Sequence, residues 1–135
     1  MAVDRERLER AARVIQEKTG ASDVLLFGSA AEGRLRHDSD IDLAYIAPSP
    51  PLSEERLSLH GALLKELGRP VDLVFLPTAS PILSMQVLRG GQPLLGPAST
   101  AFVHFTMKTV SAYDDLKRVR ASAERALLGR FATSG

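Results

Sequence analysis

The sequence predicts an α+β fold, in which helices pack against a small mixed β-sheet. Two kinds of apolar pattern lead to this prediction. Short continuous apolar runs of strand length, such as residues 24–27, alternate with longer segments such as 4–18, where apolar residues recur at helical spacing. The chain of 135 residues is long enough to bury about two-thirds of its unfolded surface. We therefore expect one domain over residues 1–135.

The first half of the chain predicts helix, strand, turn and strand in that order. Residues 4–18 form an amphipathic pattern that Gly20 would end. Residues 24–27 are a continuous apolar run, which favours a strand buried on both faces. Residues 29–33 fit one helical turn ended by a glycine. The apolar run 41–46 predicts a second buried strand, which should be central in the sheet.

The second half predicts helices alternating with two further strands. Residues 53–67 carry leucines at helical spacing, and residues 71–76 form a third apolar run of strand length. A short helix at 82–89 follows a proline-rich break. Residues 92–95 predict a short edge strand because they contain a proline, which cannot donate to a sheet ladder. A last helix is expected at about 100–128.

Composition excludes several functional classes. The net charge of +1 gives no electrostatic case for direct nucleic-acid binding. The chain has no cysteine, so disulfides, thiolate metal sites and cysteine nucleophiles are excluded. No apolar run approaches the roughly 18 residues of a membrane span, and the charged N-terminal stretch is unlike a signal peptide. We expect a cytoplasmic protein that does not associate with membranes.

Two aspartates at the start of the run 41–46 are the first candidate site residues. Alternate side chains of a strand point to one face, so Asp40 and Asp42 should lie about 6–7 Å apart on the same side. Their repulsion calls for a positive charge, and Mg²⁺ typically takes one or two carboxylates together with substrate phosphates. The structural alternative is that Asp40 caps a loop and Asp42 pairs with an arginine.

The turn after the first strand is a candidate phosphate site. Gly28 would let a phosphate approach the backbone closely. Ser29 would begin a helical turn whose free amides favour anions. A phosphate site beside a carboxylate pair predicts nucleotide-transfer chemistry.

Other polar residues near this pattern are secondary candidates. Arg34 and Arg36 would stabilise triphosphate charge, although solvated loop arginines are common. Ser39 would cap or orient the loop before Asp40. Asp72 lies early in the apolar strand 71–76, where an aspartate needs a partner, either in a structural ion pair or in the site.

The pattern Gly28-Ser29, ten intervening residues and then Asp40-x-Asp42 resembles the signature of polymerase-β-like nucleotidyltransferases. The stretch SDIDLAY is similar to the minimal nucleotidyltransferase (MNT) branch, and the resemblance covers a core of about residues 10–96. It implies the polymerase-β-like fold, ATP as substrate and two Mg²⁺ ions. By pattern, Asp72 matches the family's third carboxylate. The resemblance thus makes the three aspartates catalytic metal ligands and assigns the nucleotide phosphates to Gly28 and Ser29.

This chain departs from the MNT pattern just after Ser29. Many MNT sequences have a basic residue two or three positions after the serine, where this chain has Ala30, Ala31 and Glu32. Arg34 and Arg36 are the candidates to replace that charge.

The resemblance also implies a partner. Small MNT proteins are commonly paired with helical HEPN proteins, and similar ones are antitoxins that transfer AMP from ATP to a tyrosine hydroxyl of a HEPN ribonuclease toxin. Two alternatives are a small-molecule enzyme resembling aminoglycoside adenylyltransferases and a non-catalytic module that neutralises its partner by contact.

The helix at about 100–128 is the expected assembly surface. So long a helix on a small core should overhang it, and an exposed apolar stripe predicts a homo- or hetero-oligomer. Four arginines lie towards or just past its end. The expected stripe comprises Phe102, Phe105, Val110, Tyr113, Leu116 and Val119.

Overall fold

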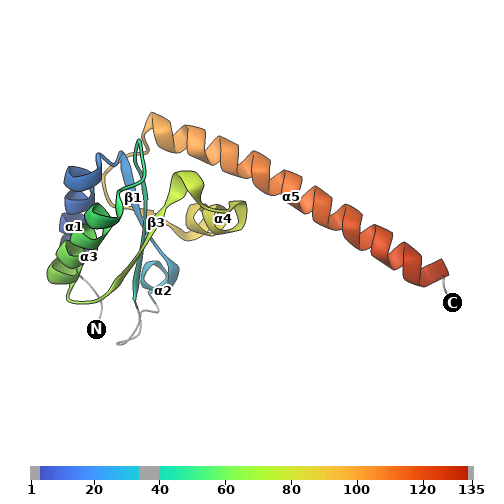
Figure 1. Ribbon diagram of the computed structural model, residues 1–135, viewed down its shortest axis with the longest axis horizontal. Coiled ribbons are helices and arrows are strands. Elements are labelled where there is room, and N and C mark those ends of the chain that lie inside the picture. Colours follow the sequence, from blue (N-terminus) through green and yellow to red (C-terminus); the bar gives the residue numbers. More distant parts are fainter. Residues whose placement is uncertain (1–3, 34–39, 134–135) are drawn as a thin grey trace.

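The computed structural model describes residues 4–33 and 40–133 and confirms the predicted α+β fold (Figure 1). Four strands form one mixed sheet in the order β3-β2-β1-β4, with β2 in the interior as expected. β1 runs antiparallel to β2 and β4, whereas β2 and β3 are parallel and joined through a helix. The strands are β1 (Asp23–Phe27), β2 (Ile41–Ile46), β3 (Val71–Phe75) and β4 (Gln92–Pro93).

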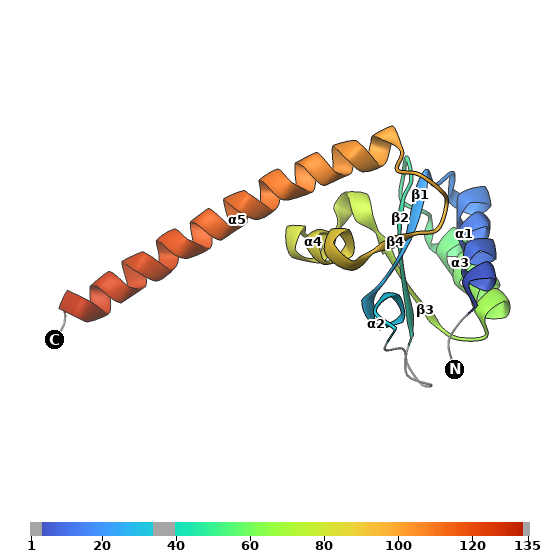
Figure 2. The same cartoon turned by 180° about the vertical axis from the view of Figure 1, so that it is seen from behind.

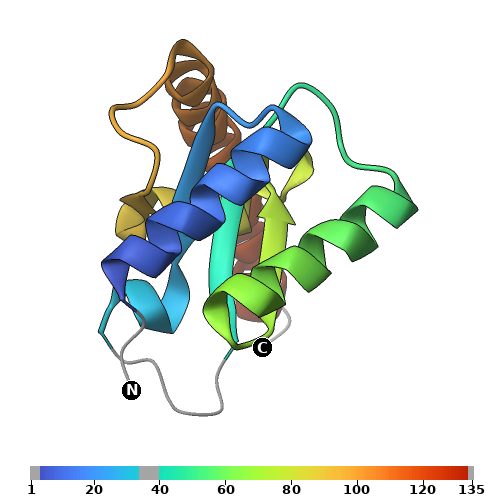
Figure 3. The same ribbon diagram turned by 90° about the vertical axis from the view of Figure 1, so that its left-hand side faces the viewer.

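Helices cover both faces of the sheet (Figures 1 and 3). α1 (Arg5–Thr19) and α3 (Ser53–Leu67) lie side by side over one face. α4 (Pro81–Gly90) and the beginning of α5 (Thr100–Thr133) lie on the other. The bounds of β2 and α3 match the predicted ones, and those of the other elements differ by one or two residues, except that α5 is longer. The remaining elements are the one-turn helix α2 (Gly28–Ala31) and a 3₁₀ turn η1 (Leu76–Thr78), which was not predicted.

The alternation of side chains along β2 divides the core into two layers. Ile41, Leu43 and Tyr45 belong to the cluster beneath α1 and α3. Ala44 and Ile46 belong to the second cluster, together with residues of α4 and α5. Because strand side chains alternate, Asp42 shares the face of Ala44 and Ile46. The candidate site therefore opens on the α4 side of the sheet.

The long helix α5 packs on α4 near its start and then extends away from the domain (Figures 1 and 2). The overhang expected for this helix is confirmed, and of the predicted stripe Val110 and Val119 are 43% and 67% exposed, while Thr109 is buried. The buried residues of α5 are those that lie against the domain near α4, and α5 continues beyond its contact with α4. Within residues 4–33 and 40–133, none of the helices combines the length and apolar character needed to span a membrane.

Candidate functional site

Three strand ends meet at one edge of the sheet and bring the central candidates together. The β1–β2 register places Phe27 opposite Asp42, and the β2–β3 register places Asp42 opposite Asp72. Gly28 follows Phe27 directly, so it lies beside the same carboxylate. Asp40 immediately precedes β2 at this edge. The order of these strands, which the sequence left open, is therefore what assembles the site.

Gly28 is required by its conformation and by its neighbour. Its φ is +73°, in the left-handed region that side chains other than glycine rarely adopt. A Cβ atom at this position would overlap Oδ2 of Asp42 and fall 3.1 Å from Cγ of that residue. The backbone at Gly28 therefore passes directly against the carboxylate, and a larger residue would displace one or the other.

Asp42 lies in an environment that disfavours its charge. Partial burial raises the pKa of the Asp42 carboxyl first, and repulsion by Asp72 and then Asp40 raises it further. A hydrogen bond with Asp72 acts in the same direction, since a proton is needed between two carboxylates. The side chains of Asp40 and Asp72 are exposed. Among the described residues, the charged groups that act on Asp42 are carboxylates, and a bound cation would stabilise this arrangement.

The donor set fits a hard divalent cation such as Mg²⁺. Asp42 and Asp72 offer carboxylate oxygens at one point, and Asp40 supplies a third carboxylate nearby. Among the described residues, no three acidic, histidine or cysteine side chains already stand close enough to hold a metal ion between them. The site thus comprises an adjacent pair of carboxylates and a third at its margin.

A cleft of about 540 Å³ opens beside these carboxylates, within the size range of small-molecule sites. Phe27, Gly28, Glu32 and Asp42 line one side, and α4 lines the other. The α4 residues are Gln86, Arg89 and Gly90. The sequence did not identify Gln86 or Arg89 as candidates, because an arginine in the last turn of a helix is ordinarily explained by the helix dipole. The signal in the sequence was the absence of a basic residue just after Ser29, which indicates that a cation must come from elsewhere in the chain.

The remaining predicted residues have different outcomes. Ser29 lies in α2 next to Gly28 and is half-buried, and its role at the phosphates remains a prediction. Arg34, Arg36 and Ser39 lie outside the described residues, and their roles remain predictions.

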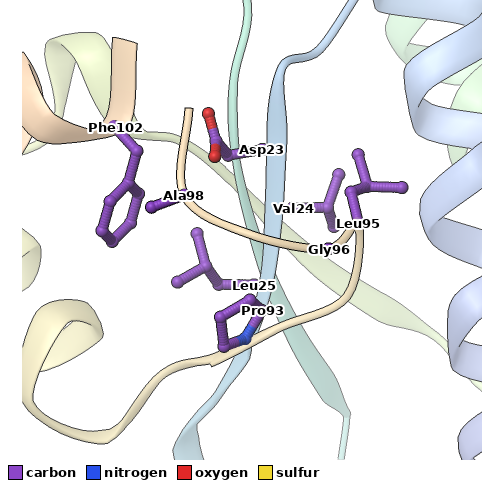
Figure 4. Close-up of a pocket in the computed structure, with 8 residues that line it drawn as sticks. All are labelled: Asp23, Val24, Leu25, Pro93, Leu95, Gly96, Ala98 and Phe102. Carbon is purple, nitrogen blue, oxygen red and sulfur yellow. The ribbon is translucent and has the colours of Figure 1, made fainter. Parts of the chain in front are cut away.

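Asp23, an aspartate that the sequence did not single out, lies at the end of β1 away from Gly28. Asp23 borders a cavity of about 20 Å³, room for about one water, which Phe102 of α5 also lines (Figure 4). Its carboxylate accepts hydrogen bonds from Ser22 Oγ at 2.7 Å, from the Ser99 amide at 3.2 Å and from Ser99 Oγ. Ser99 Oγ also accepts from the Phe102 amide at 3.1 Å. Asp23 therefore fixes the start of α5.

Comparison with known proteins matches residues 9–99 to the family described as polymerase beta, nucleotidyltransferase. The chain is 36% identical over 97 residues to the protein adenylyltransferase MntA of Shewanella oneidensis, covering 72% of this chain and 69% of that protein.

Solved structures agree over nearly the whole chain. A toxin–antitoxin structure with AMP-PNP has a TM-score of 0.77 and 28% identity, covering 93% of this chain and 99% of the other. The MNT antitoxin in complex with a tri-AMPylated HEPN toxin, from Shewanella oneidensis, has a TM-score of 0.72 and 27% identity at the same coverage. A minimal nucleotidyltransferase structure has a TM-score of 0.59 and 35% identity, covering 66% of this chain and 90% of the other.

Proposed function

The chain belongs to the polymerase beta nucleotidyltransferase family, and we propose that it is an antitoxin that transfers AMP from ATP to a tyrosine of a HEPN ribonuclease toxin. The observation that carries this proposal is the meeting of Gly28, Asp42 and Asp72 beside a nucleotide-sized cleft. The similarity to a protein adenylyltransferase supports AMP as the transferred group, and the toxin complex with tri-AMPylated HEPN protein supports the acceptor.

The carboxylates would hold Mg²⁺, with Asp40 and Asp42 on the triphosphate side and Asp72 nearer the acceptor. When bound, Mg²⁺ would neutralise phosphate charge and lower the pKa of the acceptor hydroxyl. Two ions fit the proposal, since three carboxylates repel one another without counter-charge. Residues that bind the nucleotide are Gly28 and Ser29 at the β- and γ-phosphates, with Ser39, Arg34 and Arg36 as further candidates.

The transfer breaks one bond and forms one. The tyrosine oxygen bonds to the α-phosphorus of ATP, and the bond from that phosphorus to the pyrophosphate oxygen breaks. Asp72 helps to accept the hydroxyl proton, and pyrophosphate leaves with the electron pair. The backbone at Gly28 and Ser29 holds the departing phosphates, so that charge develops where donors already lie.

α5 would supply the surface for the HEPN protein. Beyond α4 it has no packing partner within the described chain, and its apolar side chains there face outward. Val119 and Leu128 are each about two-thirds exposed, at 67%. Exposed apolar area of this kind marks partner surfaces.

The decisive experiment combines the protein with the product of the neighbouring gene, ATP and Mg²⁺, and measures the mass of that partner by mass spectrometry. We expect an added AMP on a tyrosine, lost with Asp40→Ala. Glu17→Gln is the matched control, because Glu17 is an exposed carboxylate of α1 on the opposite face. A tight complex that gains no mass would instead establish a module that acts by contact.

A further inference from the structure

The cleft beside Asp42 contains a positive charge that neither the sequence pattern nor the family signature supplied. Among the described residues that line it, Arg89 is the only basic one, and Glu32 and Asp42 are the acidic ones. A nucleotide triphosphate carries several negative charges, so a cation in the wall opposite Gly28 has an evident use.

The chain fixes the end of α4 close to Gly28. Gly91, just after α4, packs so closely on β1 that a Cβ there would lie 3.2 Å from Cδ2 of Leu25. The next residue, Gln92, pairs with Leu26 of β1 and donates from Nε2 to the carbonyl of Ala31 at 2.7 Å. The segment carrying Arg89 is therefore attached to both elements that flank the Gly28 turn.

The side chain of Arg89 is held by α5. Its guanidinium carbon lies over the ring of Tyr113, 5.3 Å from the ring centre. A guanidinium held over an aromatic ring is attracted to the ring face, and its N–H donors that point away from the ring can bind an anion. Within the described part of the chain, no carboxylate forms an ion pair with Arg89.

We propose that Arg89 binds the β- and γ-phosphates of ATP and that Tyr113 is the positioning residue that holds it there. This inference rests on the proposed function. Arg89 would supply from α4 the charge that is absent after Ser29, where the chain has Ala30, Ala31 and Glu32. Arg89 undergoes no covalent change, and its fork of donors balances the negative charge of the departing pyrophosphate. The nucleotide site would thus include the helix that extends towards the partner.

Calorimetry of ATP and of AMP in Mg²⁺ tests this proposal. Arg89→Gln should weaken ATP binding by about 10- to 100-fold, the usual range for a hydrogen-bonded charge. It should leave AMP affinity within about twofold, because AMP lacks the contacted phosphates. Arg89→Lys keeps the charge without the planar fork and should show an intermediate loss.

The role of Tyr113 has its own readout. Tyr113→Ala should weaken ATP binding severalfold, whereas Tyr113→Phe keeps the ring and should bind nearly as the wild type does. In the Arg89→Gln background, Tyr113→Ala should add nothing, since the two act as one unit. Lys117→Gln is the matched control, because Lys117 lies over the same ring at 5.8 Å but does not line the cleft.

The outcomes separate this inference from the proposed function. Unchanged ATP affinity in folded Arg89→Gln and Arg89→Lys overturns the inference but leaves the transferase proposal standing. Equal losses for ATP and AMP would also overturn it, because they indicate a general distortion of the cleft. If the wild-type protein binds no ATP in Mg²⁺ and modifies no partner, both proposals fail.

Discussion

The β1–β2 ladder carries an aspartate at each end, and the two differ in their partners. Asp23, opposite Ile46, is 7% exposed and accepts hydrogen bonds from Ser22 and from the backbone and side chain of Ser99. Asp42, opposite Phe27, has its pKa raised first by partial burial and then by repulsion from the carboxylates of Asp72 and Asp40. Burial alone therefore does not identify a functional aspartate. The hydrogen-bond donors around Asp23 stabilise its charge within the fold, whereas the carboxylates around Asp42 disfavour its charge, as expected of the proposed Mg²⁺ site.

The largest effect should follow from neutralising the crowded aspartate. Asp42→Asn keeps the shape of the side chain but removes the charge that would bind the proposed Mg²⁺, and we expect AMP transfer to fall by about a thousandfold or more. Asp23→Asn, measured below its unfolding temperature, should transfer at the wild-type rate. Partner modification followed over time by mass spectrometry measures both. Similar losses in the two variants would mean that the ends of the ladder are not functionally distinct.

The same two variants should differ in the opposite sense in their stability. Asp23→Asn leaves the Ser22 and Ser99 hydroxyls with a weaker acceptor, and we expect the free energy of unfolding to fall by about 1–3 kcal/mol. Urea unfolding monitored by circular dichroism measures it. Asp42→Asn should hold or gain stability in EDTA, because carboxylate repulsion is relieved. A loss of stability in Asp42→Asn would instead assign that residue a structural role.

Much of the fold follows from local patterns, and the site follows from one motif. Continuous apolar runs identified the buried strands, and Gly20 and Gly68 marked helix ends that the structure confirms with left-handed caps. The spacing from Gly28 to Asp42 indicated the site. A phosphate site needs the glycine in the turn after β1, and metal binding needs the aspartates at the start of the next strand, so both signals lie in one short stretch of sequence. Asp72 could be matched only by pattern, since its position beside Asp42 depends on a parallel pairing across an intervening helix.

The residues that sequence analysis missed are those defined by distant contacts. Asp23 looks like an ordinary strand boundary until Ser99, 76 positions away, reaches its carboxylate. Arg89 looks like a helix-end cation until the pairing of β1 with β4 brings it to Gly28. No local propensity encodes either relation.

The difference between Asp42 and Asp23 also predicts that the stability of the metal-free protein depends on pH. In the folded state the pKa of Asp42 lies above its ordinary value of 3.8, so the folded protein binds this proton more tightly than the unfolded chain. The destabilising charge is fully present at neutral pH and is relieved as pH falls through the raised pKa. Asp42→Asn should therefore be more stable than the wild type in EDTA at neutral pH, with the difference shrinking towards pH 3.8. A difference that is constant with pH would contradict this account of the shift.

The smallest effect concerns α5, which the Asp23 end of the ladder anchors and which the proposed partner would contact. Arg118 and Arg120 are exposed on its extended part, so reversing both to glutamate should weaken association with the HEPN protein severalfold. The loss should fall mainly on the association rate and grow at low salt, because such charges act through long-range attraction. Calorimetry should find the ATP affinity at the Gly28 end unchanged.

The matched control reverses Arg7 and Arg13, exposed residues of α1 on the far face, and changes the net charge equally. Equal slowing by both pairs would show that only net charge matters, and a loss of ATP binding would show that the two ends of the molecule are coupled.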